Sequence, residues 1–500
     1  MTGHWRLSQN PFTYFKFCSI FNCNLFTAGG ERLGKEIRAD YSQTYLLPPS
    51  LEDWISDDHP ARFIRDFVDS LDLSELGFNL PSADEGRPPY SIDLLLKVWL
   101  YGYLNKIRSS RSLERACREH MSLIWLTGNN SPDHNTLWRF WSGNEPALRN
   151  VFKQSVAVAF KSDLVSLAVQ AVDGSKIAAC VSPRNGWHKT DLEKLLVEVD
   201  RSIESMSEAV KLAEETRGGS YRLPADLRDA ESRRRKIKAA LAELTDVGRS
   251  HLHPVDKDAR MMKGNNFAYN SQAVVDDKHG LIVAEDVVNE ETDSHQLMPM
   301  VDRVKENLGD TADETLADAG YYSPEQLAEA EVKDVNVLVS IQDNRERRWS
   351  KGELKSSNFS YDEAGNIFIC PLGQDLRCER TKLSRNKKHK IKVYRCHHRD
   401  CPVRSVCSRD KRGRAIELGE YYKAVQKQRL KQNDPDKKAL LLRRMAIVEP
   451  VFAQIKEHLG FRRFTFRGLS KVKTQWSMIC TAFNLRKLCR HWASGIPLFN

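Results

Sequence analysis

The sequence has 500 residues, of which 41% are hydrophobic, and a formal net charge of +10. This length predicts two to four structural units, and the apolar content is sufficient for a core in each. No segment approaches the roughly 18 uninterrupted apolar residues that span a bilayer, which argues against a membrane protein.

The positive charge is concentrated near the C-terminus. Residues 371–500 carry 32 Lys and Arg against 10 Asp and Glu, whereas the rest of the chain carries 45 against 57. A basic end on a mildly acidic body indicates a polyanionic partner, such as nucleic acid, that is contacted mainly by that end. A basic surface without such a partner would have the same charge distribution, so charge alone leaves both interpretations open.

The eleven cysteines are an odd number, and the sequence has no clear secretory signal. Both observations argue against a disulfide framework and predict a protein of the reducing cytoplasm.

Residues 1–40 form an irregular N-terminal extension. Their aromatic segment, 12–26, is interrupted by polar residues and is followed by no clear small-residue cleavage site. It is a signal-like segment, a strand pair, or sequence upstream of the true translation start. We favour the last, because the organised pattern begins only near Tyr41.

Residues 41–155 are predicted to form a helical domain. Apolar residues recur at helical spacing in SLEDWI, HPARFIRDFVDSL and IDLLLKVWLYGYL, and Ser50 with Asp53 offers a capping pair. Two further short helices are expected in 108–128 and 131–141, with Arg and aromatic residues at their ends. This pattern suits a helix-turn-helix that reads DNA, and equally a plain helical bundle.

Strands predominate farther along the chain. Residues 164–183 are rich in Val, Ala and Ile and are broken at Asp173–Gly174, which predicts two strands joined by a hairpin. The pattern repeats at 269–288, with a turn near Asp277–Gly280. The elements expected next are an amphipathic helix at 294–308, a strand at 314–320 that ends in Asp318, a helix at 323–332 and a strand at 335–341. Together these elements predict a mixed α/β sheet.

Two insertions interrupt this sheet. In residues 186–261, apolar residues step by three and four before and after GGSYRLP, which predicts a helical hairpin with a narrow apolar seam. The second insertion, residues 344–439, is basic and rich in Cys and His.

Two aspartates stand out as ligands for divalent ions. Cleavage of a polynucleotide by two metal ions needs acidic side chains on rigid elements, with the ions roughly 3.5–4 Å apart. Asp173 follows the apolar run LAVQAV, and Asp318 ends a predicted strand on small residues. Each also has a purely local explanation, because Asp-Gly is a common hairpin turn and Asp318 could cap the helix that follows it.

Glu449 lies on a predicted helix late in the chain. One face of this helix would carry the apolar residues Met445, Val448, Phe452, Ile455 and Leu459. Glu449 and Lys456 would lie together along its edge, where they could bind a metal ion and a phosphate, or form an ordinary solvated edge. Pro450 must either open the helix or kink it.

Three motifs resemble the DDE transposases of bacterial insertion sequences, over roughly residues 41–490. VDGSKI is similar to the first-strand motif of these enzymes, and LADAGYYS to their second-Asp motif. VEPVFAQIKEHLGFRRFTFRGL, with the trailing NLRKL, is similar to their C-terminal Glu motif and is the most specific of the three. The resemblance implies that Asp173, Asp318 and Glu449 are the catalytic residues and bind Mg²⁺ or Mn²⁺.

The same resemblance implies an RNase H-like core assembled from residues 160–185, 262–343 and 440–492. It also implies that the helical domain binds double-stranded DNA and that terminal inverted repeats are the substrate. Because two element ends must be joined, we expect a homodimer or a larger assembly on DNA.

The sequence departs from the family pattern at one point. Glu449 and Lys456 keep the family spacing, but Leu442 stands at the usual Tyr position. Met445 stands at the usual Arg position, and Arg444 lies one residue earlier. The roles that the family gives to that Tyr and Arg are therefore in doubt here.

Five cysteines crowd into residues 370–407, together with His397 and His398. Four of these residues match the ligand number of a structural zinc site, namely Cys370, Cys396, Cys401 and Cys407. Their spacings are loose and lack a C-x-x-C pair, so zinc and free thiols are both open. A bound zinc would fold a basic segment that could contact DNA phosphates.

Aromatic and basic residues alternate in FRRFTFRGLSKVK (461–473), which suits contact with a DNA backbone and with exposed bases. A strand or loop with a solvated face is the alternative, but the position just after Glu449 favours DNA contact. The expected DNA-contacting residues are Arg444, Lys456, Arg462, Arg463, Arg467, Lys471 and Lys473.

These observations predict a DNA transposase. Its bound ions would activate water for in-line attack on a phosphodiester at the element end, and the freed 3′-hydroxyl would then attack target DNA. One alternative is a degenerate or domesticated relative that only binds DNA. Another is a recombinase with Tyr421 or Tyr422 as covalent nucleophile, which the lack of an Arg and His constellation around them disfavours.

Overall fold

A computed structural model describes residues 50–499, with gaps at 80–87, 218–224, 263, 265, 342–357, 384–388 and 409. The irregular extension 1–40 lies outside the described residues.

The first described part of the chain is helical, as predicted. Its elements are η1 (Leu51–Trp54), α1 (Pro60–Asp69), α2 (Ile92–Leu104), α3 (Ser110–Glu119), α4 (Met121–Leu126), α5 (His134–Gly143) and α6 (Glu145–Lys161). Ser50 and Asp53 form the predicted capping box at the start of η1. The helices bury a shared core whose largest side chains include Trp99, Trp141 and Tyr103.

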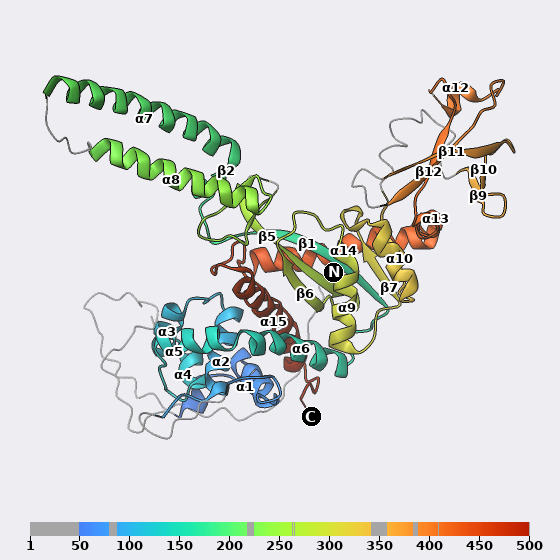
Figure 1. The fold of residues 1–500 in the computed structure, drawn as a ribbon. Helices are drawn as coiled ribbons and strands as arrows, with labels where there is room; N and C mark the ends of the chain where they lie inside the picture. The colour runs from blue at the N-terminus through green and yellow to red at the C-terminus, as the bar shows by residue number, and fades with distance from the viewer. Residues whose placement is uncertain are drawn as a thin grey trace, which may run out of the picture. The chain divides into compact units, whose positions relative to one another are not determined.

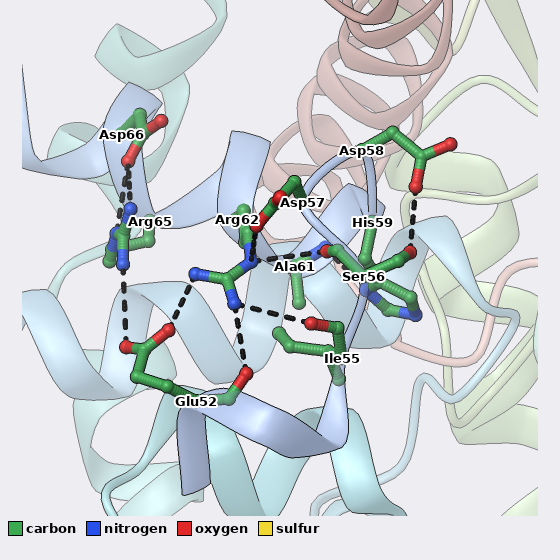
Figure 2. A network of polar contacts seen from close by, with 10 residues as sticks. All are labelled: Glu52, Ile55, Ser56, Asp57, Asp58, His59, Ala61, Arg62, Arg65 and Asp66. Atoms are coloured by element: carbon green, nitrogen blue, oxygen red, sulfur yellow. Dashed lines mark hydrogen bonds and ion pairs between the residues drawn. The ribbon is translucent and has the colours of Figure 1, made fainter. Parts of the chain in front are cut away.

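Arg62 ties the first turn of this helical part to α1 (Figure 2). Its guanidinium donates to the Glu52 carboxylate at 2.6 Å and to the carbonyl oxygens of Ser56 and Ile55 at 3.1 and 3.2 Å. The same guanidinium lies 5.0 Å from the ring centroid of Trp125 on α4. One half-buried cation therefore connects η1, α1 and α4.

A mixed sheet follows the helices (Figure 1). Its strands are β1 (Val169–Ala178), β4 (Arg260–Met262), β5 (Asn266–Asp276), β6 (Ile282–Val288), β7 (Glu314–Ala317) and β8 (Val337–Val339). β5 runs antiparallel to β1, and β6 and β4 run antiparallel to β5. On the other side, β7 is parallel to β1 and β8 is parallel to β7. The mixed α/β prediction is confirmed.

Helices connect β6 to β7 and β7 to β8, and the second connection is of the kind expected for parallel neighbours. Helix α9 (Leu297–Leu308) connects β6 to β7, and α10 (Pro324–Val332) connects β7 to β8. Both were predicted from the sequence, α9 as an amphipathic helix, and their buried faces contribute to one core together with the sheet.

The hairpin predicted at Asp173–Gly174 is wrong. β1 continues through both residues, because Asp173 pairs with Ala273 and Gly174 pairs with Gln272 in the ladder with β5. The small glycine is needed for a different reason than a turn. A Cβ at this position would lie 2.4 Å from the Gln272 side-chain nitrogen and 2.9 Å from the Asp293 carboxylate.

The chain between β1 and β4 forms the predicted helical hairpin. Helices α7 (Lys189–Arg217) and α8 (Ala225–Asp246) pack antiparallel, with an ion pair of 2.6 Å between Arg234 and Asp200 (Figure 1). A two-stranded sheet, β2 (Trp187–His188) with β3 (His251–Leu252), closes the base of the hairpin.

A second sheet lies in the Cys-rich stretch. Its strands are β9 (Ser360–Asp362), β10 (Ile367–Ile369), β11 (Asp375–Leu383), β12 (Lys390–Arg395) and β13 (Ala415–Leu418), all antiparallel to their neighbours. The sheet has a small core of its own, which includes Phe368 and Tyr394. The short α12 (Arg404–Cys407) and α13 (Tyr422–Asn433) complete this stretch.

Two long helices end the fold. α14 (Pro435–Glu457) packs on β1, β5 and β7, and α15 (Leu469–Ala493) packs on α6 and β6. On α15, the buried Asn484 side chain bonds the backbone of Ile282 through both N–H (3.0 Å) and C=O (2.8 Å). None of the described helices combines the length and the apolar character needed to cross a membrane.

The apolar face predicted for the helix around Glu449 is partly wrong. Val448, Phe452 and Ile455 are buried, but Met445 is 52% exposed. Residue 444, and not 445, faces the sheet. Pro450 does not open α14, because the helix runs from Pro435 to Glu457 with Pro450 inside it and with Val448 and Val451 buried on either side.

Glu285 on β6 offers a test of this core. Burial and, to a lesser extent, the neighbouring Asp286 raise the pKa of the Glu285 carboxyl from 4.5 to about 7. A raised carboxyl pKa means that the folded protein binds this proton more tightly than the unfolded chain does. The folded state is therefore progressively destabilised as the pH rises from about 4.5 to about 7. We expect Glu285→Gln to remove this decline and to raise the free energy of unfolding at alkaline pH by about 1–3 kcal/mol.

The measurement is urea unfolding at several pH values. Glu329→Gln is the matched control, since Glu329 is exposed on α10 and pairs with Lys333 at 2.8 Å. It should leave the pH dependence unchanged. A Glu285→Gln curve parallel to that of the wild type would contradict the assignment.

Candidate active site

Asp173 lies on β1 at the point where the parallel strand β7 ends. Val172 pairs with Ala317, the last residue of β7, and Asp318 follows directly. The two aspartates therefore lie side by side, at the carboxyl end of β7. The structure thus brings together two of the three predicted carboxylates, although they are 145 residues apart in the sequence.

The chain turns sharply after Asp318. Its Oδ1 accepts a hydrogen bond from the Gly320 N–H at 2.8 Å and caps the short η3 (Ala319–Tyr321). The strand-end and capping interpretations of Asp318 therefore both hold.

Arg444 of α14 compensates the charge at this site. Its Nη1 lies 3.2 Å from Asp173 Oδ2, and the two side chains are only 12% and 22% exposed. Burial raises the pKa of Asp173, the Arg444 guanidinium opposes that shift, and the charge of Asp318 adds to it. Two adjacent, half-buried carboxylates repel each other, and a nearby positive charge stabilises them. Arg444 supplies part of that positive charge.

In the described part of the chain, Glu449 does not join the two aspartates in a group of three that could hold a metal ion. It lies five residues after Arg444 on the same helix, which corresponds to about 7.5 Å along the axis and about 140° around it. Its side chain is exposed, whereas Arg444 faces β1. The side chain of α14 that reaches Asp173 is therefore that of Arg444.

Three of the predicted DNA-contacting arginines, Arg462, Arg463 and Arg467, are exposed on the segment between α14 and α15. This segment runs beside the end of β1. Arg463 forms a bridge with Ala178, and Arg467 Nε donates to the Cys180 carbonyl at 3.0 Å. The exposed guanidinium groups and the strand that carries Asp173 thus belong to neighbouring parts of the fold.

The predicted lysines have other surroundings. Lys471 lies 5.3 Å from the ring centroid of Trp138, and Lys473 forms an ion pair of 2.9 Å with Asp286. Lys456 is half-buried on α14.

The four predicted zinc ligands lie near one another in the second sheet. The Cys370 sulfur accepts a hydrogen bond from the Gln374 N–H at 3.3 Å, in the turn between β10 and β11. Burial raises the pKa of the Cys407 thiol, Arg414 opposes this, and the thiols of Cys401, Cys396 and Cys370 raise it further. By contrast, Cys378 is exposed on β11.

Neither cluster is a complete metal site as it stands. In the part of the chain that the structure describes, no group of three or more His, Cys, Asp or Glu side chains is arranged to hold a metal ion. The residues in both clusters have the right chemistry, namely hard oxygens in one and thiols in the other.

Sequence reasoning missed a set of polar residues beside the aspartates. Asn270 and Gln272 are fully buried on β5, Tyr321 is buried after Asp318, and Asp293 lies in the loop before α9. The available signal was the pair of amides, Asn270 and Gln272, two residues apart in a strand that is buried almost throughout, since a buried amide needs a partner.

Two known families match the sequence. Residues 369–489 match a family described as transposase DDE domain, and residues 49–143 match one described as transposase domain (DUF772). The first match contains Glu449 and the cysteine cluster, whereas Asp173 and Asp318 lie outside both matches. Searches of curated proteins and of solved structures found no match.

A helical part that matches one transposase family, followed by a late segment that matches a DDE domain, defines the class of this protein as a transposase. The two matches, over residues 369–489 and 49–143, support the resemblance to the DDE transposases of insertion sequences.

Adjacent arginines allow a test of the Arg444–Asp173 pair. Arg444→Met would leave a half-buried Asp173 next to Asp318 without its cation, which we expect to lower the free energy of unfolding by about 1–3 kcal/mol. Arg443→Met is the control, because Arg443 is 58% exposed and pairs with Asp277 at the surface. Its expected effect is below about 0.5 kcal/mol.

Urea unfolding at neutral pH measures both variants. Adding Asp173→Asn to Arg444→Met should recover part of the loss, because the uncompensated charge is then gone. Equal losses in the two arginine variants would contradict the proposed compensation.

Proposed function

We propose that this transposase binds the terminal inverted repeats of an insertion sequence and cleaves and joins DNA with divalent metal ions held by Asp173, Asp318 and Glu449. The observation that carries the proposal is the side-by-side placement of Asp173 and Asp318 on adjacent parallel strands. An acidic pair at the carboxyl end of a strand is a suitable ligand set for Mg²⁺ or Mn²⁺.

An RNase H-like core is part of this proposal. Three antiparallel strands in the order β6–β5–β1, continued by the parallel strands β7 and β8, support it. So does the position of α14, which crosses β1 and β7 and carries Glu449.

The two aspartates fit the metal ions better than Glu449 does. Asp173 and Asp318 already lie together, in a place where their mutual repulsion favours a cation. When bound, divalent ions would supply Lewis-acid activation of a phosphodiester and of the attacking oxygen. Glu449 would have to approach from the exposed side of α14 to complete the set.

The chain's own residues would hold and orient DNA. Arg462, Arg463 and Arg467 present exposed guanidinium groups beside the end of β1, where they could neutralise phosphates near the cut. Arg444 is the cation closest to Asp173 and could turn to a phosphate when a metal ion replaces it there.

DNA recognition by the helical part belongs to the same proposal. Helices α3, α4 and α5 are short, and α3 carries Arg115 and Arg118 while α5 carries Arg139, which suits a helix-turn-helix. We also propose that two copies assemble on DNA, since the reaction joins two element ends.

A relative that only binds DNA is the second candidate. It is favoured by the exposed position of Glu449 and by the ion pair between Arg444 and Asp173. Both observations fit a protein in which the three acidic residues do not form one metal-binding site.

A nicking assay separates the two candidates. The substrate is a labelled oligonucleotide of the inverted repeats that flank the reading frame, with Mn²⁺ as cofactor. We expect cleavage by the wild type, and a loss of at least about a hundredfold in Asp173→Asn and Asp318→Asn. These changes remove metal ligands that contribute several kcal/mol to the transition state. Asp302→Asn, in a surface pair with Lys333, should cleave normally. Cleavage that survives Asp173→Asn would refute the site.

Glu449→Gln addresses the third ligand in the same assay. A loss as large as that of Asp173→Asn supports Glu449 as a ligand, and Glu306→Gln, at an exposed glutamate of α9, is its control. Wild-type cleavage by Glu449→Gln would remove Glu449 from the site.

We propose in addition that Cys370, Cys396, Cys401 and Cys407 bind a structural zinc ion. Two observations support this: the hydrogen bond from the Gln374 N–H to the Cys370 sulfur, and the close approach of the backbone at Gly413 to Cys396. A Cβ at Gly413 would lie 2.1 Å from the Cys396 carbonyl oxygen. Zinc would join the turn after β10 to the segment after β12.

The protein purified under reducing conditions should then contain about one zinc per chain by mass spectrometry. Cys396→Ser should lower this content and destabilise the second sheet, whereas Cys378→Ser, at an exposed cysteine, should do neither. A zinc content that is the same in both variants would contradict the site.

A further inference from the structure

A polar network lies on the opposite face of β1 from Asp173. Because side chains alternate along a strand, Gly174 and Lys176 point away from the face that carries Asp173. On their side lies Asp293, in the loop between β6 and α9. Its Oδ1 is 2.9 Å from the position that a Cβ on Gly174 would occupy. A side chain at this position would displace the Asp293 carboxylate or the Gln272 amide from its place in the network.

Asp293 is held by three side chains from two strands. Lys176 Nζ donates to its two oxygens at 2.9 and 3.2 Å. The buried amides of Asn270 and Gln272 on β5 donate to Oδ1 at 2.6 and 2.8 Å. A carboxylate with this many donors has a single orientation and neutralises the Lys176 ammonium.

The network continues to the turn that carries Asp318. The Tyr321 hydroxyl donates to Gln272 Oε1, and Tyr321 is itself buried. Gly320 separates the two carboxylates. A Cβ there would lie 3.0 Å from Asp318 Oδ1 and 3.7 Å from Asp293 Oδ2. Asp293 is thus connected to Asp318 through Gln272 and Tyr321, and to the strand of Asp173 through Lys176.

We propose that Asp293 is a positioning residue for the Asp173–Asp318 pair, an inference that rests on the function proposed above. It acts in two ways. Through Gln272 and Tyr321 it fixes the turn after Asp318, and so the separation of the two aspartates. By neutralising Lys176 it prevents an unpaired positive charge from opposing a cation at the site. Residues that orient metal ligands typically affect metal affinity by about 10–100-fold.

The test is Mn²⁺ binding to the DNA-free, full-length protein, followed by the electron paramagnetic resonance signal of free Mn²⁺. Asp293→Asn keeps the shape and one acceptor oxygen but loses the charge. We expect its Kd for Mn²⁺ to rise about tenfold or more. Asp302→Asn makes the same chemical change in a surface pair with Lys333 (2.8 Å) and should leave the Kd within about twofold.

Tyr321→Phe tests the connection without removing a charge. It deletes only the hydroxyl that bonds Gln272, so the protein should fold, and we expect a smaller rise in the Kd. Both variants should lower kcat for cleavage of the repeat oligonucleotide and leave the KM for DNA within about twofold, because they alter the carboxylates and not the DNA contacts.

The outcomes are distinguishable. If the wild type binds no Mn²⁺, the proposed function fails. If Asp173→Asn abolishes binding while folded Asp293→Asn binds Mn²⁺ as the wild type does, the metal site stands and the positioning role is overturned. A Kd that rises in Asp293→Asn and in Tyr321→Phe, but not in Asp302→Asn, supports the role.

Discussion

The pairing of β1 on both of its edges is the constraint on which the site depends. β1 is antiparallel to β5 on one edge and parallel to β7 on the other. The register with β7 places Asp173 beside Asp318. A shift of one residue would turn Asp173 to the opposite face of the sheet, away from Arg444. The backbone pairing of β1 with β7 is therefore enough to place the two aspartates next to each other.

The polar residues around this pair follow from the same constraint. A half-buried carboxylate needs either a cation or hydrogen-bond donors, and the fold supplies both from different directions. Arg444 approaches from α14 on one face of β1, and Lys176, Asn270 and Gln272 surround Asp293 on the other. Gly174 is small because this second group occupies the space of a Cβ.

Elements with a regular apolar period were predictable from sequence. α2, α9 and the hairpin of α7 and α8 agree with their apolar spacing, and the capping box at Ser50 agrees with its motif. Asp173–Gly174 was misread as a hairpin. The local Asp-Gly signal is the same whether the chain folds back there or continues straight as one strand, as it does in β1. Met445 was placed on the buried face by spacing alone. In the structure the buried face of α14 includes Val448 and Phe452 but not Met445, which is exposed.

The residues of the candidate site divide in the same way. Asp173 and Asp318 could be selected from sequence, since an isolated acid at the end of an apolar segment is conspicuous in a single chain. The sequence by itself therefore indicated the class of elements, the two candidate aspartates and the resemblance to transposases. Only the tertiary structure decided that Arg444 and not Glu449 reaches Asp173, and that Asp293 supports the pair. Those relations depend on how a helix is rotated on the sheet and on which loop covers its other face, and neither is encoded in local spacing.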